Sequence, residues 1–175
     1  MAPVVLTRDQ TRFIELFTLH PELLTHFYLS GGTALAAYYF HHRESDDLDF
    51  FTDTSISLPA VTACMHQAKT ELGAKKITYE HLYDRHIFMV ETTPLLKVEF
   101  TLYPFPHLAP AMKKEGLLVD SLLDIGANKL FALFDRNEPK DFVDLYFILK
   151  KLSIKTLISG VKKKFDFTIL TTYYI

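Results

Sequence analysis

The sequence predicts an α/β (α+β) fold, in which an α/β sheet is followed by a helical C-terminal part. Over residues 1–120, short runs of alternating polarity are interspersed with apolar patterns of helical period, whereas residues 121–165 show helical periods. The 175 residues are 49% apolar, which is enough to bury one sizeable core. We therefore expect a core at residues 1–120 and a helical region at residues 121–175 packed on it, either as two domains or as one.

Each expected element has a local signal. Thr7 has the position of a helix cap, Pro21 begins a short helix, and Ser57 precedes a helix with Pro59 in its first turn. Helices are expected at 8–19, from Pro21, and at 33–42, 58–72, 121–135, 140–150 and 153–165. Strands are expected at 27–30, 47–52, 75–80, 85–92, 95–103 and 117–119.

A pair of glycines separates the expected strand at 27–30 from the helix that follows it. At Gly31 and Gly32 the backbone can approach a phosphate closely, and the start of a helix offers unpaired N–H groups to phosphate oxygens. The hydroxyl of Thr33 can add a hydrogen bond to this cradle. The alternative is an ordinary tight turn, because a glycine pair before a helix also occurs without a ligand.

Two aspartates lie on one face of the next expected strand. Side chains two residues apart in a strand point the same way, about 7 Å apart along the chain, so Asp47 and Asp49 share a face while Leu48 and Phe50 enter the core. Two carboxylates on one face suit Mg²⁺, and two-metal phosphoryl-transfer sites hold their ions about 3.5–4 Å apart. Taken alone, the pair has a second interpretation as a solvated strand edge.

In this order, the glycine turn and the acidic pair resemble the signature of the nucleotidyltransferase superfamily shared with polymerase beta. The resemblance implies a nucleotidyltransferase fold, a mixed sheet flanked by helices, with a third carboxylate on a neighbouring strand. Glu99 is the only acid in the strand-like run at 95–103, and Lys97 lies on the same face. The alternative for Lys97 and Glu99 is a surface pair without a part in any site.

Two further segments resemble the AbiEii/AbiGii toxin family of nucleotidyltransferases. The run from Lys140 to Leu145 is similar to that family's Lys-Asp-x-x-Asp-Leu element, and it is preceded by a helix with Lys129 and by Arg136. The run from His42 to Phe50 looks like the family's first motif. The resemblance covers roughly residues 7–165.

The resemblance implies an enzyme that transfers a nucleoside monophosphate from an NTP to an acceptor with Mg²⁺ (or Mn²⁺) and releases pyrophosphate. Asp47, Asp49 and Glu99 would hold the metal, and Glu99 would also help to deprotonate the attacking hydroxyl. The implied nucleotide-binding residues are Gly31, Gly32, Thr33, Ser45, Lys97, Lys129 and Lys140. Asp144 would orient a lysine or an acceptor group.

Without the resemblance, the charged residues of the last helices would be assigned differently. Lys140 and Asp144 would belong to solvated ion pairs on a helix surface, which contribute little to stability. With the resemblance, the alternative to a site role for Asp141 is that it caps the helix.

The basic residues are concentrated near the end of the chain. The net charge of −2 argues against general coating of nucleic acid, but residues 150–175 hold six of the 19 basic residues and one of the 21 acidic residues. These six are Lys150, Lys151, Lys155, Lys162, Lys163 and Lys164. They could track a polynucleotide backbone or form a solvated helix face. The family resemblance implies a tRNA 3′ end as the acceptor, and a toxin of a toxin–antitoxin or phage-defence pair with a cognate antitoxin.

The remaining observations concern the compartment and the alternatives. Cys64 is the single cysteine, so an internal disulfide is excluded, and the histidines have no zinc spacing. With neither a signal peptide nor a stretch near the ~20 residues of a membrane span, we expect a cytoplasmic protein without membrane contact. Two other functions stay open: a small-molecule nucleotidyltransferase of the antibiotic-modifying kind, and a catalytically silent protein-binding module of the same fold.

Overall fold

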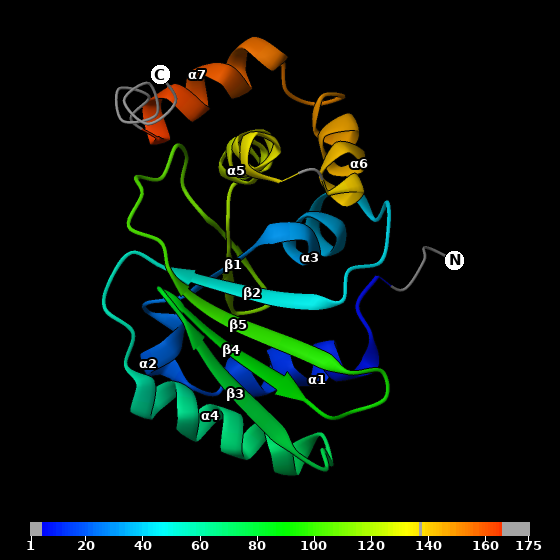
Figure 1. Ribbon diagram of the computed structural model, residues 1–175, viewed down its shortest axis with the longest axis vertical. Coiled ribbons are helices and arrows are strands. Elements are labelled where there is room, and N and C mark those ends of the chain that lie inside the picture. The colour runs from blue at the N-terminus through cyan, green and yellow to red at the C-terminus, as the bar shows by residue number, and fades with distance from the viewer. Residues whose placement is uncertain (1–4, 137, 166–175) are drawn as a thin grey trace. The chain divides into compact units, whose positions relative to one another are not determined.

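The structure, a computed structural model, describes residues 5–136 and 138–165 of the chain (Figure 1). It divides into two compact units. The first, the sheet unit, comprises Met1–Pro104 and Ala111–Val119, and the second, the helical unit, comprises Phe105–Pro110 and Asp120–Ile175. The segment Phe105–Pro110 thus groups with the helices although Ala111–Val119 of the sheet unit separates it from Asp120 along the chain. The limits 1–120 and 121–175 stay a prediction of domain boundaries.

A mixed sheet of seven strands forms the centre of the sheet unit. Its order is β3-β4-β5-β2-β1-β7-β6, with β1 parallel to β7, β2 parallel to β5 and the other neighbours antiparallel. The strands are β1 (Tyr28–Ser30), β2 (Asp47–Thr52), β3 (Ile77–Leu82), β4 (Arg85–Val90), β5 (Leu96–Leu102), β6 (Met112–Lys114) and β7 (Leu117–Val119). This mixed sheet, with helices around it, confirms the predicted fold class.

Helices cover both faces of the sheet. Helices α1 (Arg8–Phe17), α2 (Pro21–Leu24) and α4 (Leu58–Glu71) lie on one face, and α3 (Gly31–Leu35) lies on the other (Figure 1). Aromatic rings join α1 to the first face, since the ring centroids of Phe17 and Phe50 are 4.3 Å apart and those of Phe50 and Phe100 are 5.4 Å apart. Burial of such large apolar groups drives the packing. Because Phe50 enters this core, the aspartates at alternate positions of β2 project from the opposite face.

The predicted cap of α1 is present and also fixes a distant loop. Thr7 and Gln10 form a reciprocal capping box, in which the Gln10 N–H donates to Thr7 Oγ1 at 3.2 Å and the Thr7 N–H donates to Gln10 Oε1 at 2.8 Å. The amide Nε2 of Gln10 donates to the carbonyl oxygen of Ser45 at 2.6 Å. This bond ties α1 to the loop that leads into β2.

Three elements differ from the sequence-based expectation. The helix expected at 33–42 begins at Gly31 and continues as a π-helical turn, η1 (Ala36–Phe40), which ends at His41 in a left-handed conformation with φ 50°. Strand β3 extends to Leu82 because each of its residues pairs with β4. Strand β6 was not predicted, since Met112–Lys114 has little β propensity and is a strand because it pairs with β7.

Three helices make up most of the helical unit: α5 (Leu122–Asp135), α6 (Pro139–Ile148) and α7 (Ile154–Lys164). As predicted, Ser121 caps α5, and its Oγ accepts a hydrogen bond from the Asp124 N–H at 3.0 Å. A Cβ on Gly126 would lie 2.7 Å from Leu157 Cδ2, so this glycine allows α5 and α7 to pack closely. Of the helices described, none is long and apolar enough to cross a bilayer.

Candidate functional site

Three carboxylates, here called the acidic cluster, lie side by side on β2 and β5. The parallel register pairs Asp47 with Lys97 and Asp49 with Glu99. Paired residues of adjacent strands point to the same side of a sheet, with the strands about 4.8 Å apart. The acidic cluster therefore consists of Asp47, Asp49 and Glu99, with Lys97 among them. The structure brings together these four residues, which the sequence placed on strands about 50 residues apart.

Two basic side chains neutralise part of the charge of the acidic cluster. The Nζ of Lys97 lies 3.1 Å from Asp47 Oδ2 and 3.3 Å from Glu99 Oε2. Arg85, on β4, makes a two-pronged ion pair in which Nε is 2.5 Å from Glu99 Oε1 and Nη2 is 2.7 Å from Glu99 Oε2. The Thr101 hydroxyl also donates to Glu99 Oε1, at 2.9 Å. Both carboxylate oxygens of Glu99 are therefore engaged within the protein.

These contacts keep Glu99 ionised. Glu99 is only 4% exposed, and burial works to raise its pKa. The hydrogen bonds from Arg85 and the positive charge of Lys97 outweigh burial, so the pKa of Glu99 lies below its usual value. Burial likewise works to lower the pKa of Lys97, but Asp47 and Glu99 outweigh it and raise that pKa. An ionised, hydrogen-bonded Glu99 is suited to binding cations and is a weak proton acceptor.

The acidic cluster fits a hard divalent cation. Carboxylate oxygens are the protein ligands that Mg²⁺ and Mn²⁺ prefer. The side chain of Asp47 is 44% exposed, so an ion can reach it from solvent. The ammonium of Lys97 lies between Asp47 and Glu99, which shows that the cluster already stabilises a positive charge there.

The glycine turn lies directly beside the acidic cluster. Gly31 has φ +72°, a conformation that favours glycine, and a Cβ at this position would meet the carboxylate of Asp49. A Cβ on Gly32 would meet the guanidinium of Arg43, and would lie 3.0 Å from Ser45 Oγ. The predicted nucleotide-binding residues Gly31, Gly32 and Ser45 are therefore neighbours of one another and of Asp49.

The hydroxyl of Thr33 has a different role from the one expected. It donates a hydrogen bond to the main-chain carbonyl of Asp47 and so ties α3 to the start of β2. The hydroxyl proton that was expected to reach a phosphate oxygen is thus donated to the carbonyl oxygen of Asp47.

A buried ion-pair network holds the helical unit together. The Nζ of Lys129, on α5, lies 2.7 Å from Asp141 Oδ1 and 2.8 Å from Asp144 Oδ2, both on α6. All three residues are buried, and Arg136 Nε donates to Asp141 Oδ2 at 3.0 Å. The interpretation of Asp144 as a solvated surface group is therefore wrong. Asp141 does not cap α6, because its carboxylate pairs with Lys129 and Arg136 and the cap position is Glu138.

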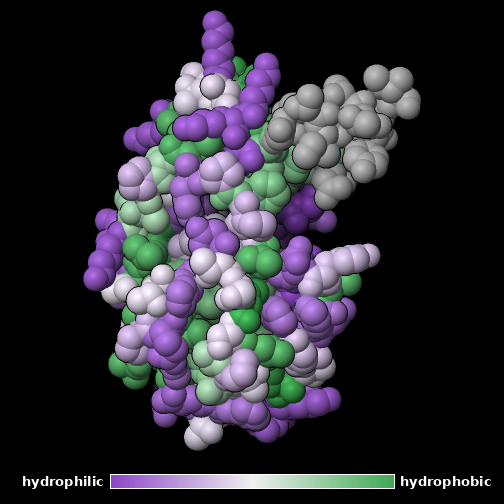
Figure 2. Space-filling model, turned by 90° about the vertical axis from the view of Figure 1, so that its left-hand side faces the viewer, coloured by the Kyte–Doolittle hydropathy of each residue, from purple (hydrophilic) through white to green (hydrophobic). Residues whose placement is uncertain are grey.

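The six C-terminal lysines do not form one exposed face. Lys150, Lys151, Lys155, Lys162 and Lys163 are exposed, and hydrophilic side chains project from the helical unit in the face shown in Figure 2. Lys164 is 3% exposed, and its Nζ lies 2.7 Å from Asp124 Oδ1. The expectation that Lys164 tracks an RNA backbone is therefore wrong. Its position follows the apolar stripe of α7, since Leu157, Gly160 and Val161 are buried at the preceding i, i+3 and i+4 positions.

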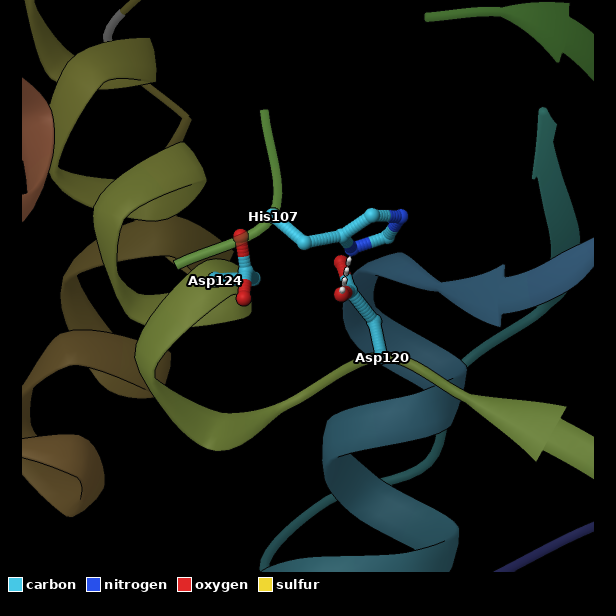
Figure 3. Close-up of side chains that lie close together, drawn as sticks. All are labelled: His107, Asp120 and Asp124. Atoms are coloured by element: carbon cyan, nitrogen blue, oxygen red, sulfur yellow. Dashed lines mark ion pairs between the residues drawn. The ribbon is translucent and has the colours of Figure 1, made fainter. Parts of the chain in front are cut away.

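A second group of polar side chains lies in the helical unit (Figure 3). One ligand atom each from His107, Asp120 and Asp124 lies within 4.8 Å of the others, a spacing that could hold a metal ion. The Nδ1 of His107 is 3.7 Å from Asp120 Oδ1, and its hydrogen bond to Asp120 raises the pKa of His107.

Internal donors already occupy the carboxylate of Asp124. They are the N–H groups of Leu108 and Ala109 at 3.0 and 3.1 Å, the hydroxyl of Ser121 at 2.6 Å and the ammonium of Lys164 at 2.7 Å. The group therefore acts as a clamp that holds residues 107–109 against α5 and α7. In the acidic cluster, by contrast, the Asp47 side chain is 44% exposed, so a metal ion can reach it from solvent.

Sequence reasoning missed three charged residues beside these groups. Arg85 was recognisable as the one Lys, Arg, Asp or Glu among residues 85–90, on the face that alternation leaves opposite the core. Arg43 lies in the run from His42 to Phe50 that resembles the family's first motif, but nothing local gave it a role, and Asp120 follows a strand end, where a charge is ordinary. Only their tertiary neighbours distinguish them.

Comparison with known proteins agrees with this geometry. Residues 15–168 match the family model described as "Nucleotidyl transferase AbiEii toxin, Type IV TA system". The chain belongs to the AbiEii nucleotidyltransferase family. An uncharacterized protein of Aquifex aeolicus is 34% identical to this AbiEii-family chain over 151 residues, which are 82% of this chain and 70% of the relative.

Solved structures share the fold of this AbiEii-family protein. A putative nucleotidyltransferase from H. pylori superposes with a TM-score of 0.63 at 24% identity, covering 90% of this chain and 76% of that one. The antibiotic-resistance factor ANT(2'')-Ia superposes with a TM-score of 0.60 at 12% identity, covering 96% and 95% of the two chains. Together with the family match, this makes the protein an enzyme of the nucleotidyltransferase type.

Proposed function

We propose that this AbiEii-family enzyme transfers a nucleoside monophosphate from an NTP to a hydroxyl of an RNA, with a tRNA 3′ end as the expected acceptor. One observation carries the proposal: the parallel register of β2 and β5 sets Asp47, Asp49 and Glu99 together beside the Gly31–Gly32 turn. This pairs cation-binding carboxylates with a backbone that a phosphate can approach. Because the matching family is described as a toxin family, we propose that the protein acts in the cytoplasm and has a cognate antitoxin as its partner.

The metal, Mg²⁺ or Mn²⁺, would be held by Asp47, Asp49 and Glu99. When bound there, it would neutralise charge on the reacting phosphate oxygens. Arg85 and Thr101 hold the Glu99 carboxylate by three hydrogen bonds, so its oxygens stay ionised and fixed in direction. Lys97 adds a further positive charge between Asp47 and Glu99. Catalysis by this cluster is mainly positioning and charge neutralisation.

The transfer itself is an in-line displacement. The acceptor oxygen bonds to the α-phosphorus, the bond from that phosphorus to the bridging oxygen breaks, and pyrophosphate leaves with the bonding electron pair. The proton of the acceptor hydroxyl must leave in the same step. Because Arg85, Lys97 and Thr101 already engage both oxygens of Glu99, we propose that solvent or the leaving group is the final proton acceptor.

Lys129 and Lys140 stay candidates to bind the triphosphate, but Lys129 is buried whereas Lys140 is exposed. The ammonium of Lys129 is bound by two buried carboxylates, so we propose that Asp144 and Asp141 hold this lysine in place. Lys140 is exposed on the first turn of α6 and is the better candidate to contact a phosphate oxygen.

The acceptor is proposed from the charge of the helical unit. Five exposed lysines lie in residues 150–163, a length of chain without an acidic residue. Such a group can contact successive phosphates of a polynucleotide. A small-molecule acceptor of the antibiotic type would instead need an acidic pocket, and the likeness to ANT(2'')-Ia concerns the fold alone.

The test is incubation of the protein with each labelled NTP, Mg²⁺ and total RNA. Label should appear in RNA of tRNA size with one or more of the nucleotides. Asp47→Asn and Asp49→Asn should each reduce transfer by orders of magnitude, because each removes a metal ligand. Asp53→Asn, an exposed aspartate just after β2, is the matched control and should transfer normally. Transfer within tenfold of wild type in either active-site variant would contradict the proposed role of the acidic cluster.

A further inference from the structure

The glycine turn lies between two side chains of opposite charge. A Cβ on Gly31 would meet the carboxylate of Asp49, whereas a Cβ on Gly32 would meet the guanidinium of Arg43, whose Cζ would be 3.4 Å away. Each charged group therefore packs against the bare α-carbon of one glycine. Gly31 thus has a negatively charged neighbour, and Gly32, the next residue, has a positively charged one.

The loop that carries Arg43 is held in a defined position. Gln10, which is 1% exposed, donates from Nε2 to the carbonyl oxygen of Ser45 at 2.6 Å. The Nη1 of Arg43 donates to the carbonyl oxygen of Glu44 at 2.7 Å, which orients the guanidinium plane. The Arg43 side chain is only half-exposed. Its place against Gly32 is therefore part of the fold, unlike that of a freely solvated arginine.

We propose that Arg43 binds the β- and γ-phosphates of the NTP at Gly32, and so binds the pyrophosphate leaving group. This inference rests on the proposed function and deepens it. A guanidinium presents five N–H donors in a planar fork that matches phosphate oxygens, and it stays charged at all physiological pH values. Lying against Gly32, it can share phosphate oxygens with the backbone of the turn.

The charge separation across the turn gives the triphosphate a direction. Asp49 attracts the cation and repels phosphate oxygens, whereas Arg43 attracts them. When the bond to the α-phosphorus breaks, negative charge develops on the leaving pyrophosphate, and a cation in contact with it stabilises that charge. Arg43 therefore acts on triphosphates and pyrophosphate, and a nucleoside monophosphate does not reach it.

The test is calorimetric titration of the full chain, with Mg²⁺, using inorganic tripolyphosphate, an NTP and the matching nucleoside monophosphate. Arg43→Gln should weaken binding of tripolyphosphate and NTP by about tenfold or more, because it removes charge-assisted hydrogen bonds. Arg43→Lys should restore part of the affinity, since it keeps the charge and loses the fork. Affinity for the monophosphate should stay unchanged. Arg8→Gln, at an exposed arginine of α1, is the matched control.

A second variant covers the case in which Arg43→Gln does not fold. Gly32→Ala places a methyl group where the guanidinium lies, so it should weaken tripolyphosphate binding in the wild-type background. Tripolyphosphate affinity within twofold of wild type in a folded Arg43→Gln variant, or in Gly32→Ala, would overturn the inference. If in that case Asp49→Asn still abolishes nucleotide transfer, the proposed function stands. If the wild type binds neither tripolyphosphate nor NTP, both proposals are wrong.

Discussion

Replacement of Lys164 by methionine should destabilise the helical unit far more than the same change at Lys162 or Lys163. The three lysines are consecutive, but the side chain of Lys164 is 1% exposed while those of its two neighbours lie in exposed residues. Methionine retains the apolar stem and removes the ammonium, so the comparison isolates the ion pair with Asp124. The neighbours supply controls of identical chemistry.

The magnitude follows from the burial of both partners. Removing one member of a buried ion pair leaves an uncompensated charge and typically costs about 3–5 kcal/mol, whereas exposed substitutions stay within about ±0.5 kcal/mol. Asp124 keeps its donors from Leu108, Ala109 and Ser121, so we expect the lower part of the range. Asp124→Asn combined with Lys164→Met should recover part of the loss, because the remaining carboxyl charge is removed.

The assay is urea unfolding, with amide hydrogen exchange to follow α5 and α7 separately from the sheet unit. Protection in α5 and α7 should fall in Lys164→Met and stay unchanged in Lys162→Met. A difference below about 1 kcal/mol between these two variants would refute the reasoning, because it would mean that the pair contributes no more than a surface contact.

The same pair predicts a pH dependence. Burial works to raise the pKa of Asp124, but the hydrogen bonds from Lys164, Ser121 and Leu108 outweigh it, and the pKa lies below its usual value. A lowered folded-state pKa means that the ionised group stabilises the fold above about pH 4 and that this contribution is lost as pH falls through the lowered pKa. The difference between wild type and Lys164→Met should thus be constant near neutral pH and shrink in acid. A constant difference down to about pH 2 would contradict the assignment.

Four further predictions concern other lysines and the glycine turn. Lys129→Met should destabilise the helical unit by about 3–5 kcal/mol in urea unfolding, because it removes the ammonium that two buried carboxylates share. Calorimetry on Lys140→Ala should show weaker NTP binding if that exposed lysine contacts phosphate. Lys162→Glu with Lys163→Glu should weaken RNA binding, and each lost phosphate contact should lower the log–log salt slope by about 0.7–0.9; equal slopes would mean that these lysines are only a solvated face. Gly31→Ala should weaken Mn²⁺ binding, measured by electron paramagnetic resonance, because φ +72° and the Asp49 carboxylate both oppose a Cβ; unchanged affinity would separate the turn from the metal site.

The local pattern of apolar and polar residues determined most of the secondary structure and the face of β2 from which Asp47 and Asp49 project. The strand at 47–52 was predicted with its observed limits, because alternation of Leu48 and Phe50 with Asp47 and Asp49 depends only on the two-residue period of a strand. The caps at Thr7 and Ser121 were likewise predictable, since a cap bonds a backbone group three residues away.

The partners of the charged side chains were decided by the tertiary structure. Glu99 reaches Asp49 through the parallel register of β2 and β5, and Arg85 reaches Glu99 through the β4–β5 pairing. The network of Lys129 with Asp141 and the pair of Lys164 with Asp124 are contacts between different helices. A helical period shows which residues share a face, but not which face the rest of the chain covers. The sequence therefore determined where the charges point, and the packing of distant segments decided which charge each one meets.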